Sequence, residues 1–463
     1  MKKILITGAG GFLGRRLMLE LFKAGHEVTG VVRRPLSEAD ELPCSYVTWD
    51  MAREECPVAL DAFDLVIHLA GASIAEGRWT EARKKLLLES RVLSTQSLHR
   101  ALAKRSQPLP LFFGASAIGI YPYGESPVDE QSAEGTHFLA GLCKDWEAAL
   151  KQIPAQRSLI MRLGVVLGDG GGALSPMLNA ARWGFAGPLG SGRQRISWIH
   201  VDDIVSLVLT ALDQTRYAGV INCVSPEPCT QADFARELAK LLSRPYGLPT
   251  PAGLLRLMLG EMADIVLQSQ NVRAKRLEEE LGFPYRFRSL RSALEDLCNI
   301  HRRDDGKAFA CRRLMAQQFV PRPLEEVFPF FCDPYNLEKI TPELLSFKIK
   351  DVSSPQIVEG TLINYALKVH GFPMRWRTRI EEWRTNQRFV DNQLKGPYTV
   401  WHHTHEFFAV PGGTLMTDRV RYRVPFGFLG EIFALPLVRR DVRQIFAFRR
   451  KIIGEMFPSR TSK

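Results

Sequence analysis

The stretch of sequence that decides the fold is KKILITGAGGFLG, residues Lys2–Gly14. Its apolar run, Ile4–Ile6, suits a strand that is buried on both faces of a parallel sheet. Apolar residues then recur at near-helical spacing as far as Gly25, and Val28–Val32 supplies a second strand. A strand, a glycine turn, a helix and a second strand therefore follow one another in the order of a dinucleotide-binding unit.

The glycines of this turn have the spacing GxxGxxG, a close variant of the dinucleotide-binding pattern. Such glycines allow a tight turn, close approach of the backbone to a diphosphate, and close packing of the helix on the strand. The helix that follows would direct its positive end at the diphosphate. The residues predicted to contact the cofactor here are Gly8, Gly11, Phe12, Leu13 and Gly14.

The second strand ends in Arg33-Arg34, where an NAD site usually carries an Asp or Glu that binds the ribose hydroxyls. A guanidinium can hold a 2′-phosphate through paired, charge-assisted hydrogen bonds, whereas a carboxylate would repel it. We therefore predict NADP(H) in preference to NAD(H), with Arg33 and Arg34 at the phosphate. A solvated basic turn is the alternative, because three acidic residues follow within positions 38–41.

Length and composition indicate a soluble chain of several domains. At 463 residues the chain is too long for one ordinary core, so two or three domains are expected. No apolar run reaches the length of a membrane span, and the first residues enter a strand with no apolar signal segment. The eight cysteines show no CxxC pair and no disulfide-like spacing. We therefore expect reduced thiols and a cytoplasmic location.

The net charge of +11 is unevenly distributed along the chain. Residues 301–463 contain 27 Lys and Arg against 17 Asp and Glu, whereas the first 300 residues contain 34 against 33. Such an excess can mark a nucleic-acid or anionic-surface site. Here the basic residues alternate with Trp, Phe and Val in strand-like segments, so a polar sheet face is favoured and no nucleic-acid partner is expected.

Strands and helices alternate through the first 250 residues, which predicts a doubly wound parallel sheet whose ligands lie at the carboxyl ends of the strands. Asp50, after the third strand, is predicted to lie on the adenine side of the cofactor. Leu69, Ala70 and Gly71, after the fourth strand, would let the backbone approach the cofactor. Further strands are expected at Tyr46–Trp49, Asp64–Leu69, Leu111–Gly114, Leu159–Val166 and Val220–Val224, and helices at Glu81–Lys104, Phe138–Lys151 and Gln231–Leu242, with N-caps at Asp202 and Thr230.

From Phe319 the pattern changes to one helix, a series of short alternating strands, and a long terminal helix at Gly430–Met456. This order predicts a curved antiparallel sheet wrapped round one long helix. The expected domains are a dinucleotide-binding unit at 1–247, a small helical cap at 248–300, a basic irregular connector at 301–318, and a second domain at 319–463. Strands of the second domain are expected at Thr361–Lys368, Met374–Trp383, Phe389–Leu394, Val400–Phe408 and Thr414–Val424.

Several motifs in the first 300 residues carry a family resemblance: Thr7–Gly14, His68–Gly71, Ala115–Gly119, Asp145–Glu147, Arg162–Gly168, Trp198–Asp203, Leu259–Ala263 and Leu281–Phe283. With this set the region resembles the epimerase-like subfamily of the extended short-chain dehydrogenases/reductases. The resemblance implies a Rossmann-type fold and an NADP(H)-dependent, epimerase- or dehydratase-like oxidoreductase acting on a small organic substrate. It also implies cofactor contacts by Arg91, Arg162 and Val165.

The last part of the chain resembles a second family through Val327–Pro334, Lys395–Tyr398 and Thr417–Tyr422. It is similar to the helix-grip superfamily, which includes polyketide cyclase-like and lipid-transfer (START-like) domains. Members enclose an apolar cavity between the sheet and the helix. The resemblance therefore implies an α+β domain that binds a hydrophobic ligand, although fold analogy does not name the ligand.

Dehydrogenases of the first family typically use Ser or Thr, Tyr and Lys, in which the hydroxyls hold a carbonyl oxygen and Lys lowers the pKa of Tyr. Ser116 matches the first position. The Tyr-xxx-Lys pair is missing, because Leu139 and Cys143 stand at its two positions. We predict that Tyr121 supplies the phenol from the other wall. Two hypotheses stay open: an oxidoreductase, and a binding or sensor protein that holds NADP(H) without turnover.

Two further features of the second domain have chemical potential. His403 and His405 share one face of a predicted strand and suggest a metal, but no third ligand is evident in the sequence, so none is assigned. The basic terminal helix is expected to be the helix that the sheet grips, with a helix on a membrane surface as the alternative.

Overall fold

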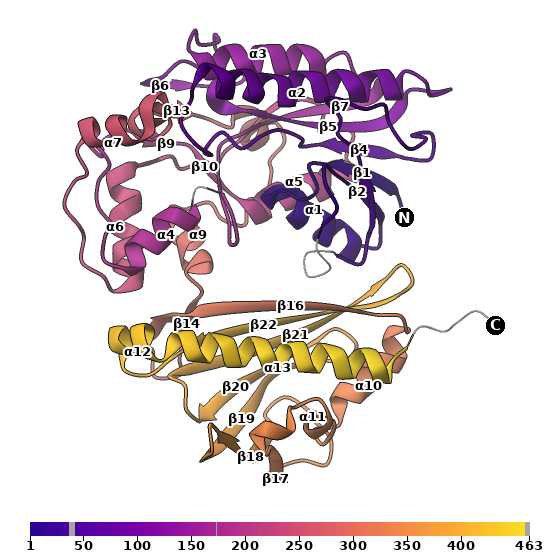
Figure 1. The fold of residues 1–463 in the computed structure, drawn as a ribbon, viewed down its shortest axis with the longest axis vertical. Coiled ribbons are helices and arrows are strands. Elements are labelled where there is room, and N and C mark those ends of the chain that lie inside the picture. Colours follow the sequence, from indigo (N-terminus) through magenta and orange to yellow (C-terminus); the bar gives the residue numbers. More distant parts are fainter. Residues whose placement is uncertain (37–41, 173, 459–463) are drawn as a thin grey trace. The chain divides into compact units, whose positions relative to one another are not determined.

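The structure, a computed structural model, describes residues 1–36, 42–172 and 174–458. The acidic residues at 38–41 that motivated the alternative for Arg33 and Arg34 lie outside the described residues. The chain divides into two compact units, Met1–Leu297 and Cys298–Lys463, which are described separately (Figure 1). Among the described helices, none combines the length and the apolar character that crossing a membrane requires.

The first unit is built on a parallel sheet of seven strands in the order β11-β7-β5-β4-β1-β2-β3. Ile4, Leu5 and Ile6 are fully buried, as expected of a strand covered on both faces. The strand order reverses between β1 and β4, which is the switch point at which such sheets bind ligands. The strands are β1 (Lys3–Thr7), β2 (Glu27–Val32), β3 (Ser45–Thr48), β4 (Leu65–His68), β5 (Leu109–Ala117), β7 (Ala155–Leu163) and β11 (Gly219–Cys223).

Helices cover both faces of this sheet, with α2 beside α3 and α1 beside α5 (Figure 1). The predicted doubly wound α/β fold is therefore confirmed. The helices of this part are α1 (Phe12–Lys23), α2 (Glu81–Leu102), α3 (Phe138–Leu150), α4 (Leu174–Arg182), α5 (Val201–Asp213) and α6 (Gln231–Leu242).

The predicted helix caps had mixed outcomes. Thr230 caps α6 as expected, because its hydroxyl oxygen accepts from the backbone N–H of Asp233 at 3.1 Å. The expected cap of α5 at Asp202 is wrong. The cap is His200, whose Nδ1 accepts from the N–H of Asp202 at 3.1 Å, while the carboxylate of Asp202 is bound by Arg16 of α1 at 2.8 Å.

The cap at 248–300, which was expected to be helical, contains a strand as well as helices. One of its segments, β13 (Gln270–Val272), pairs with β6 (Gly124–Val128) in a small parallel ladder, and a short polar segment has too little periodicity to reveal this in the sequence. The remaining elements of the first unit are η2 (Ile118–Ile120), β8 (Val165–Leu167), β9 (Arg195–Ile196), β10 (Trp198–His200), β12 (Cys229–Thr230), α7 (Ala252–Leu259), η3 (Gly260–Ala263), α8 (Asp264–Leu267), η4 (Arg276–Glu280) and α9 (Leu290–Leu297).

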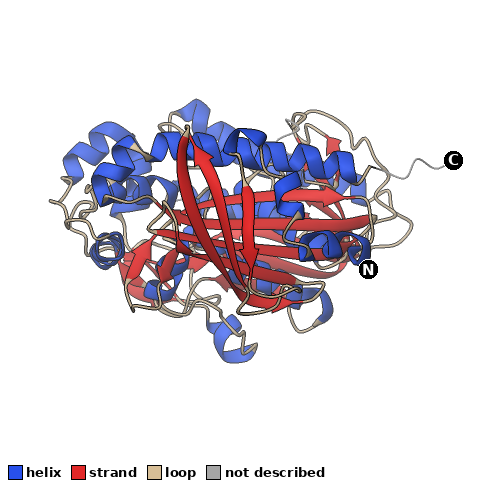
Figure 2. Ribbon diagram, turned by 90° about the horizontal axis from the view of Figure 1, so that it is seen from below, coloured by secondary structure: helices blue, strands red, loops and turns tan. Residues whose placement is uncertain are grey.

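The second unit has an antiparallel sheet of seven strands in the order β16-β22-β21-β20-β19-β18-β17, and the long helix α13 lies across it (Figures 1 and 2). The predicted helix-grip arrangement is therefore confirmed. Its elements are β16 (Arg312–Val320), α10 (Leu324–Cys332), α11 (Asn336–Lys339), η5 (Glu343–Leu345), β17 (Lys348–Val352), β18 (Leu362–Val369), β19 (Phe372–Arg384), β20 (Arg388–Lys395), β21 (Val400–Val410), β22 (Gly413–Arg423), α12 (Gly427–Phe433) and α13 (Leu435–Met456).

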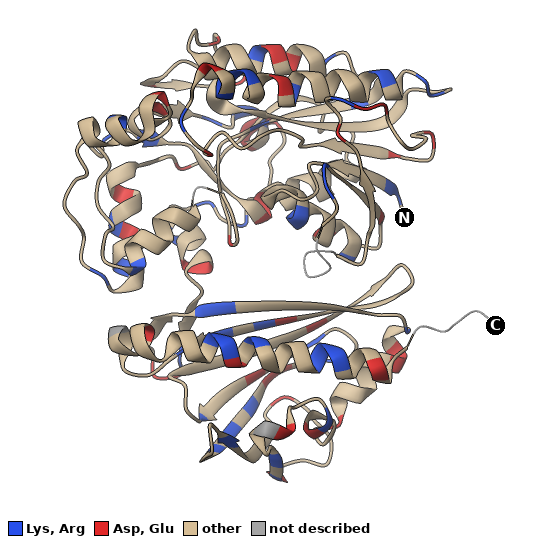
Figure 3. Ribbon diagram, viewed as in Figure 1, with Lys and Arg blue, Asp and Glu red and all other residues tan. Residues whose placement is uncertain are grey.

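The prediction of an irregular connector at 301–318 is wrong. This region contains a hairpin of β14 (Ile300–Arg302) and β15 (Ala308–Ala310) and most of β16, which pairs along its whole length with β22. The basic residues that made the segment resemble a linker have partners in the sheet domain, as Arg312 does with Glu431 at 3.0 Å. Basic residues also recur along α13 (Figure 3).

Candidate functional site

The glycine turn between β1 and α1 forms a cradle that side chains would fill. Gly8 has φ +70°, and a Cβ added to it would lie 2.8 Å from the backbone of Leu69. A Cβ at Gly14 would overlap the carbonyl oxygen of Gly8. Gly11 is the N-cap of α1 and has no side chain to accept from the first N–H groups of that helix. The helix therefore presents free donors and its positive end at the switch point, which fits a diphosphate.

The backbone beside this cradle, Leu69–Gly71, is fixed by a buried chain of hydrogen bonds. Thr95 donates its hydroxyl proton to the carbonyl of Arg91 at 2.7 Å, so it accepts from Nε2 of His68 at 3.0 Å. Nδ1 of His68 then accepts from Thr7 at 2.7 Å, and the Thr7 oxygen accepts from the N–H groups of Leu69 and Ala70. A neutral His68 satisfies every partner, and burial lowers its pKa to about 3.

The burial of His68 predicts that the stability of the protein depends on pH. A histidine in the unfolded chain has a pKa of about 6.5, so below that pH the unfolded state binds a proton that folded His68 refuses until about pH 3. The free energy of unfolding should therefore fall as the pH drops below 6.5, by up to about 1.4 kcal/mol per pH unit. Urea denaturation of the full chain and of His68→Gln between pH 7 and pH 4 measures it. The variant should show a shallower slope, and equal slopes would contradict the assignment.

The predicted ligands of the adenosine end lie at the carboxyl ends of β2 and β3. Arg33 and Arg34 follow β2 directly, and both side chains are exposed. Asp50 follows β3 after the buried Trp49, and its carboxylate accepts from the N–H of Ala52 at 3.3 Å. The structure thus brings these three residues to the same edge of the sheet as the cradle. Their contacts with a cofactor stay predictions.

Arg91 and Val165 lie near the same edge. Arg91 bonds the carbonyl of Ala72 at 3.0 Å and lies over the ring of Trp146, and a Cβ at Gly71 would come within 3.1 Å of its guanidinium carbon. Val165 begins β8, where its N–H bonds the carbonyl of Ser197 at 2.9 Å. Arg91 is therefore held against the segment that was predicted to approach the cofactor.

Ser116 and Arg162 meet in a buried network centred on Glu147. The Ser116 hydroxyl donates to Glu147 at 2.7 Å, and Arg162 binds both carboxylate oxygens at 2.8 and 2.9 Å. All three residues are at most 6% exposed. The serine proton is thus given to a carboxylate rather than offered to a substrate. Arg162 neutralises this carboxylate inside the unit, and its contact with the cofactor stays a prediction.

Tyr121 belongs to the same network and has no exposed surface. Its hydroxyl accepts from Arg162 at 2.7 Å and donates to the side-chain oxygen of Asn222 at 2.8 Å. Burial raises the pKa of Tyr121 despite the neighbouring guanidinium. The geometry therefore does not support Tyr121 as a proton donor to a substrate, and its catalytic role stays a prediction without structural support.

The positions usually held by the Tyr-xxx-Lys pair lie on α3, at Leu139 and Cys143. A Cβ at Gly119 would touch both side chains, at 3.3 Å from Leu139 Cβ and 3.9 Å from Cys143 Sγ. Burial raises the pKa of Cys143 to about 12, so this thiol is a poor nucleophile. Lys144 points elsewhere and pairs with Glu134 at 3.4 Å.

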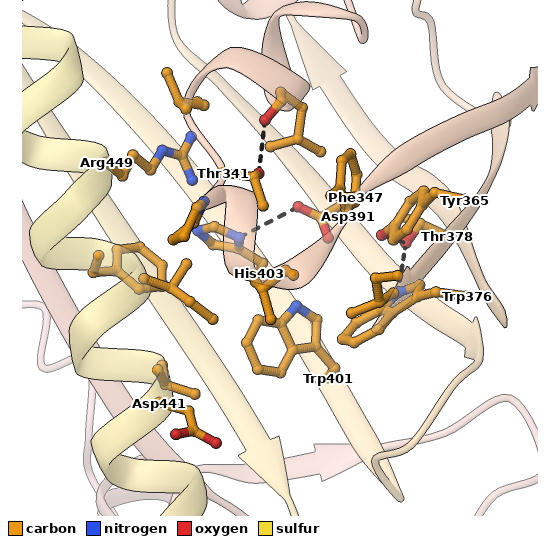
Figure 4. Close-up of a pocket in the computed structure, with 18 of the residues that line it drawn as sticks. Thr341, Phe347, Tyr365, Trp376, Thr378, Asp391, Trp401, His403, Asp441 and Arg449 are labelled. Carbon is orange, nitrogen blue, oxygen red and sulfur yellow. Dashed lines mark hydrogen bonds and ion pairs between the residues drawn. The ribbon is translucent and has the colours of Figure 1, made fainter. Parts of the chain in front are cut away.

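The second unit contains a cavity of about 630 Å³ between its sheet, α10, α11 and α13. Figure 4 shows its aromatic wall, where Trp376, Trp401 and Tyr365 stand side by side. Tyr365 and the indole N–H of Trp376 both bond the hydroxyl of Thr378, at 2.6 and 3.1 Å. With its polar wall groups mostly bonded to one another, the cavity suits an apolar ligand.

One wall of the cavity is charged, and the sequence did not reveal its full composition. His403 and Asp391 of the neighbouring strand face the cavity (Figure 4), and His405 also lines it. Asp391 is the third potential ligand that was not evident in the sequence. Only the register of β20 against β21 places it opposite His403. Glu147 was also missed as a site residue, although its position on the helix that carries Cys143 was a usable signal.

Three families match this chain. Residues 4–223 match the family described as "NAD dependent epimerase/dehydratase family". Residues 250–297 match a "Domain of unknown function (DUF1731)", and residues 320–448 match "Polyketide cyclase / dehydrase and lipid transport". The matches follow the order of the two units, and the middle one coincides with the cap of the first unit.

Relatives of known name cover the first unit. "Epimerase family protein SDR39U1 homolog, chloroplastic" of Arabidopsis thaliana is 37% identical over 302 residues, which are 63% of this chain and 85% of that protein. "Epimerase family protein SDR39U1" of Mus musculus is 36% identical over 302 residues, which are 64% of this chain and 99% of that protein.

Among solved structures, the human epimerase family protein SDR39U1 (isoform 2) with NADPH is 33% identical, with a TM-score of 0.58. The match covers 64% of this chain and 99% of the human protein. The sheet order, the glycine cradle and relatives matched over nearly their whole length agree, and the chain belongs to the NAD dependent epimerase/dehydratase family.

Proposed function

We propose that this protein is an NADP(H)-binding, epimerase- or dehydratase-like oxidoreductase for a small organic substrate, with a second unit that binds a hydrophobic ligand. One observation carries the first part: α1 directs free N–H groups into a cradle in which neither Gly8 nor Gly14 has room for a side chain. The human relative, whose structure contains NADPH, supports the same cofactor class.

The residues of the cradle would hold the cofactor by its diphosphate. The backbone N–H groups of Phe12 and Leu13 would bond the phosphate oxygens, and Leu69–Gly71 would line the path toward the nicotinamide. When bound, a nicotinamide supplies reversible hydride transfer to or from a substrate carbon. Arg91, held against Gly71 and Trp146, would limit the space beside it.

The choice of NADP(H) rests on Arg33 and Arg34, and Arg33→Asp tests it. Loss of a charged hydrogen bond to the 2′-phosphate should weaken NADPH binding by about 1.5–3 kcal/mol, roughly 10- to 150-fold, and leave NADH binding unchanged. Isothermal titration calorimetry with both coenzymes measures it. Arg100→Asp, an exposed residue near the C-terminal end of α2, is the matched control. An equal loss for both coenzymes would refute the assignment.

A second candidate function is a binding or sensor protein that holds NADP(H) without turnover. The network of Ser116, Glu147, Arg162 and Tyr121 favours it, because the hydroxyl protons of Ser116 and Tyr121 go to protein groups. Stopped-flow oxidation of bound NADPH over a panel of carbonyl compounds separates the candidates. Turnover of any member supports the oxidoreductase, whereas tight binding with no turnover supports the sensor.

The proposal for the second unit rests on its cavity. About 630 Å³ lies within the range of cavities that enclose drug-sized ligands, and aromatic and aliphatic side chains form most of its wall. Mass spectrometry of the intact chain under non-denaturing conditions, after exposure to a mixture of fatty acids and isoprenoid quinones, tests this. A retained apolar ligand supports the proposal, and retention of none would contradict it.

A further inference from the structure

Four ionisable side chains form a compact buried cluster on three neighbouring strands of the second unit. Asp391 of β20 is the register partner of His403 in β21, and Asp418 of β22 is the register partner of His405. Alternation along the strands puts all four on one face of the sheet, and the two imidazole rings lie 3.7 Å apart. His403, His405 and Asp418 are at most 7% exposed.

The atoms on the cavity side of this cluster have the separations of metal ligands. Oδ2 of Asp391 lies 3.5 Å from Nδ1 of His403 and 3.1 Å from Nε2 of His405. Ligand atoms held about 2.0–2.1 Å from a tetrahedral ion are about 3.3 Å from one another. One of the two measured distances is slightly longer than this value and the other is slightly shorter. The ligand atoms of these three residues all lie within 4.8 Å of one another.

The other side of the cluster supplies the support that metal-bound histidines need. Asp418 Oδ1 lies 3.0 Å from Nε2 of His403 and 2.7 Å from Nδ1 of His405, the nitrogens that face away from Asp391. A carboxylate in this position fixes the ring orientation and makes the ligand nitrogen more basic. Arg449 lies 3.9 Å from Asp418 and partly balances the charge of that carboxylate.

We propose that Asp391, His403 and His405 bind one divalent transition-metal ion of the zinc or iron(II) class at the wall of the apolar cavity. Two imidazoles and one carboxylate suit these ions, whereas Mg²⁺ and Ca²⁺ prefer oxygen ligands alone. The three side chains line the cavity, so a fourth coordination position opens toward it. An oxygen of a bound apolar ligand, such as a carbonyl or carboxylate, is the group that this position would take.

The test is metal binding by the full chain after removal of metals with a chelator. The chain is titrated with Zn²⁺ and, separately, with Co²⁺, whose binding is monitored by its visible absorption. Elemental mass spectrometry should then find one bound ion per chain. Asp391→Asn, a change of similar shape, and His403→Gln should each weaken binding at least about 100-fold. Asp418→Asn, which removes only the supporting carboxylate, should weaken it about 10- to 100-fold.

The matched control is His402→Gln. His402 precedes His403 but lies 3.3 Å from Glu381, and its ring packs at a tilt against that of His301, away from the cavity cluster, so its loss should leave binding unchanged. Thermal melts of each variant verify the fold. Binding of no ion, or an affinity that Asp391→Asn and His403→Gln leave unaltered, would overturn the proposal.

Discussion

Glu147→Ala is expected to lower the free energy of unfolding of the first unit by about 3–5 kcal/mol. The carboxylate of Glu147 is 2% exposed and receives two hydrogen bonds from Arg162 and one from Ser116. Its removal leaves the guanidinium of Arg162 buried and uncompensated, and the Ser116 hydroxyl without its acceptor. Breaking a buried pair on one side is costly because the remaining charge has lost both its partner and its water.

Urea denaturation measures this effect, with the transition of the first unit assigned by hydrogen exchange in β5 and α3. Asp145→Ala is the control, since Asp145 is exposed two residues earlier on the same helix and should change stability by no more than about 0.5 kcal/mol. Glu147→Gln keeps the shape and removes only the charge, so it should also destabilise. If both Glu147 variants behaved like Asp145→Ala, the network would not have the structural role assigned to it.

Gly14→Ala is expected to abolish or strongly weaken binding of both NADPH and NADH. The added Cβ would overlap the carbonyl oxygen of Gly8 and the Cα of Ala9, which are backbone atoms of the turn and cannot rotate away. The N-terminal turn of α1 must therefore move outward, and the N–H groups leave the position that the diphosphate requires. Overpacking of this kind typically costs about 1–3 kcal/mol, which corresponds to a loss of affinity of at least about fivefold even if the fold survives.

Calorimetric titration of the full chain checks this result, and Gly141→Ala on α3 is the control. A Cβ at Gly141 would meet no described atom within 4 Å, and alanine in a helix interior is more favourable than glycine by about 0.5–1 kcal/mol. That variant should bind coenzyme as the parent does. Unchanged binding by a folded Gly14→Ala variant would mean that the coenzyme does not use this cradle.

Local sequence patterns predicted the elements of the first unit well. Ile4–Ile6 is a continuous apolar run that suits a strand covered on both faces, and the glycines beside it have the spacing of a dinucleotide-binding turn. Thr230 was recognised as a cap because a threonine hydroxyl that bonds the third residue of a helix is a local event. Such features depend on neighbours in the chain, so the sequence contains the information directly.

The features that the sequence did not predict depend on contacts between distant segments. The sequence did not show that Glu147 and Arg162, from a helix and another strand, form hydrogen bonds with the hydroxyl groups of Ser116 and Tyr121. Asp391 became a partner of the histidines only through the register of two strands. The strand β16 was taken for a connector, because all of its residues except Val320 are half-buried and its sequence lacks the alternation that marks a strand with one buried face.

Titration calorimetry of NADPH and NADH against the full chain tests whether the first unit binds a dinucleotide. We expect one NADPH bound per chain, more tightly than NADH, with the affinity lost in Gly14→Ala and the preference lost in Arg33→Asp. A chain that binds neither coenzyme at millimolar concentration would contradict the claim that the amides of α1 hold a dinucleotide.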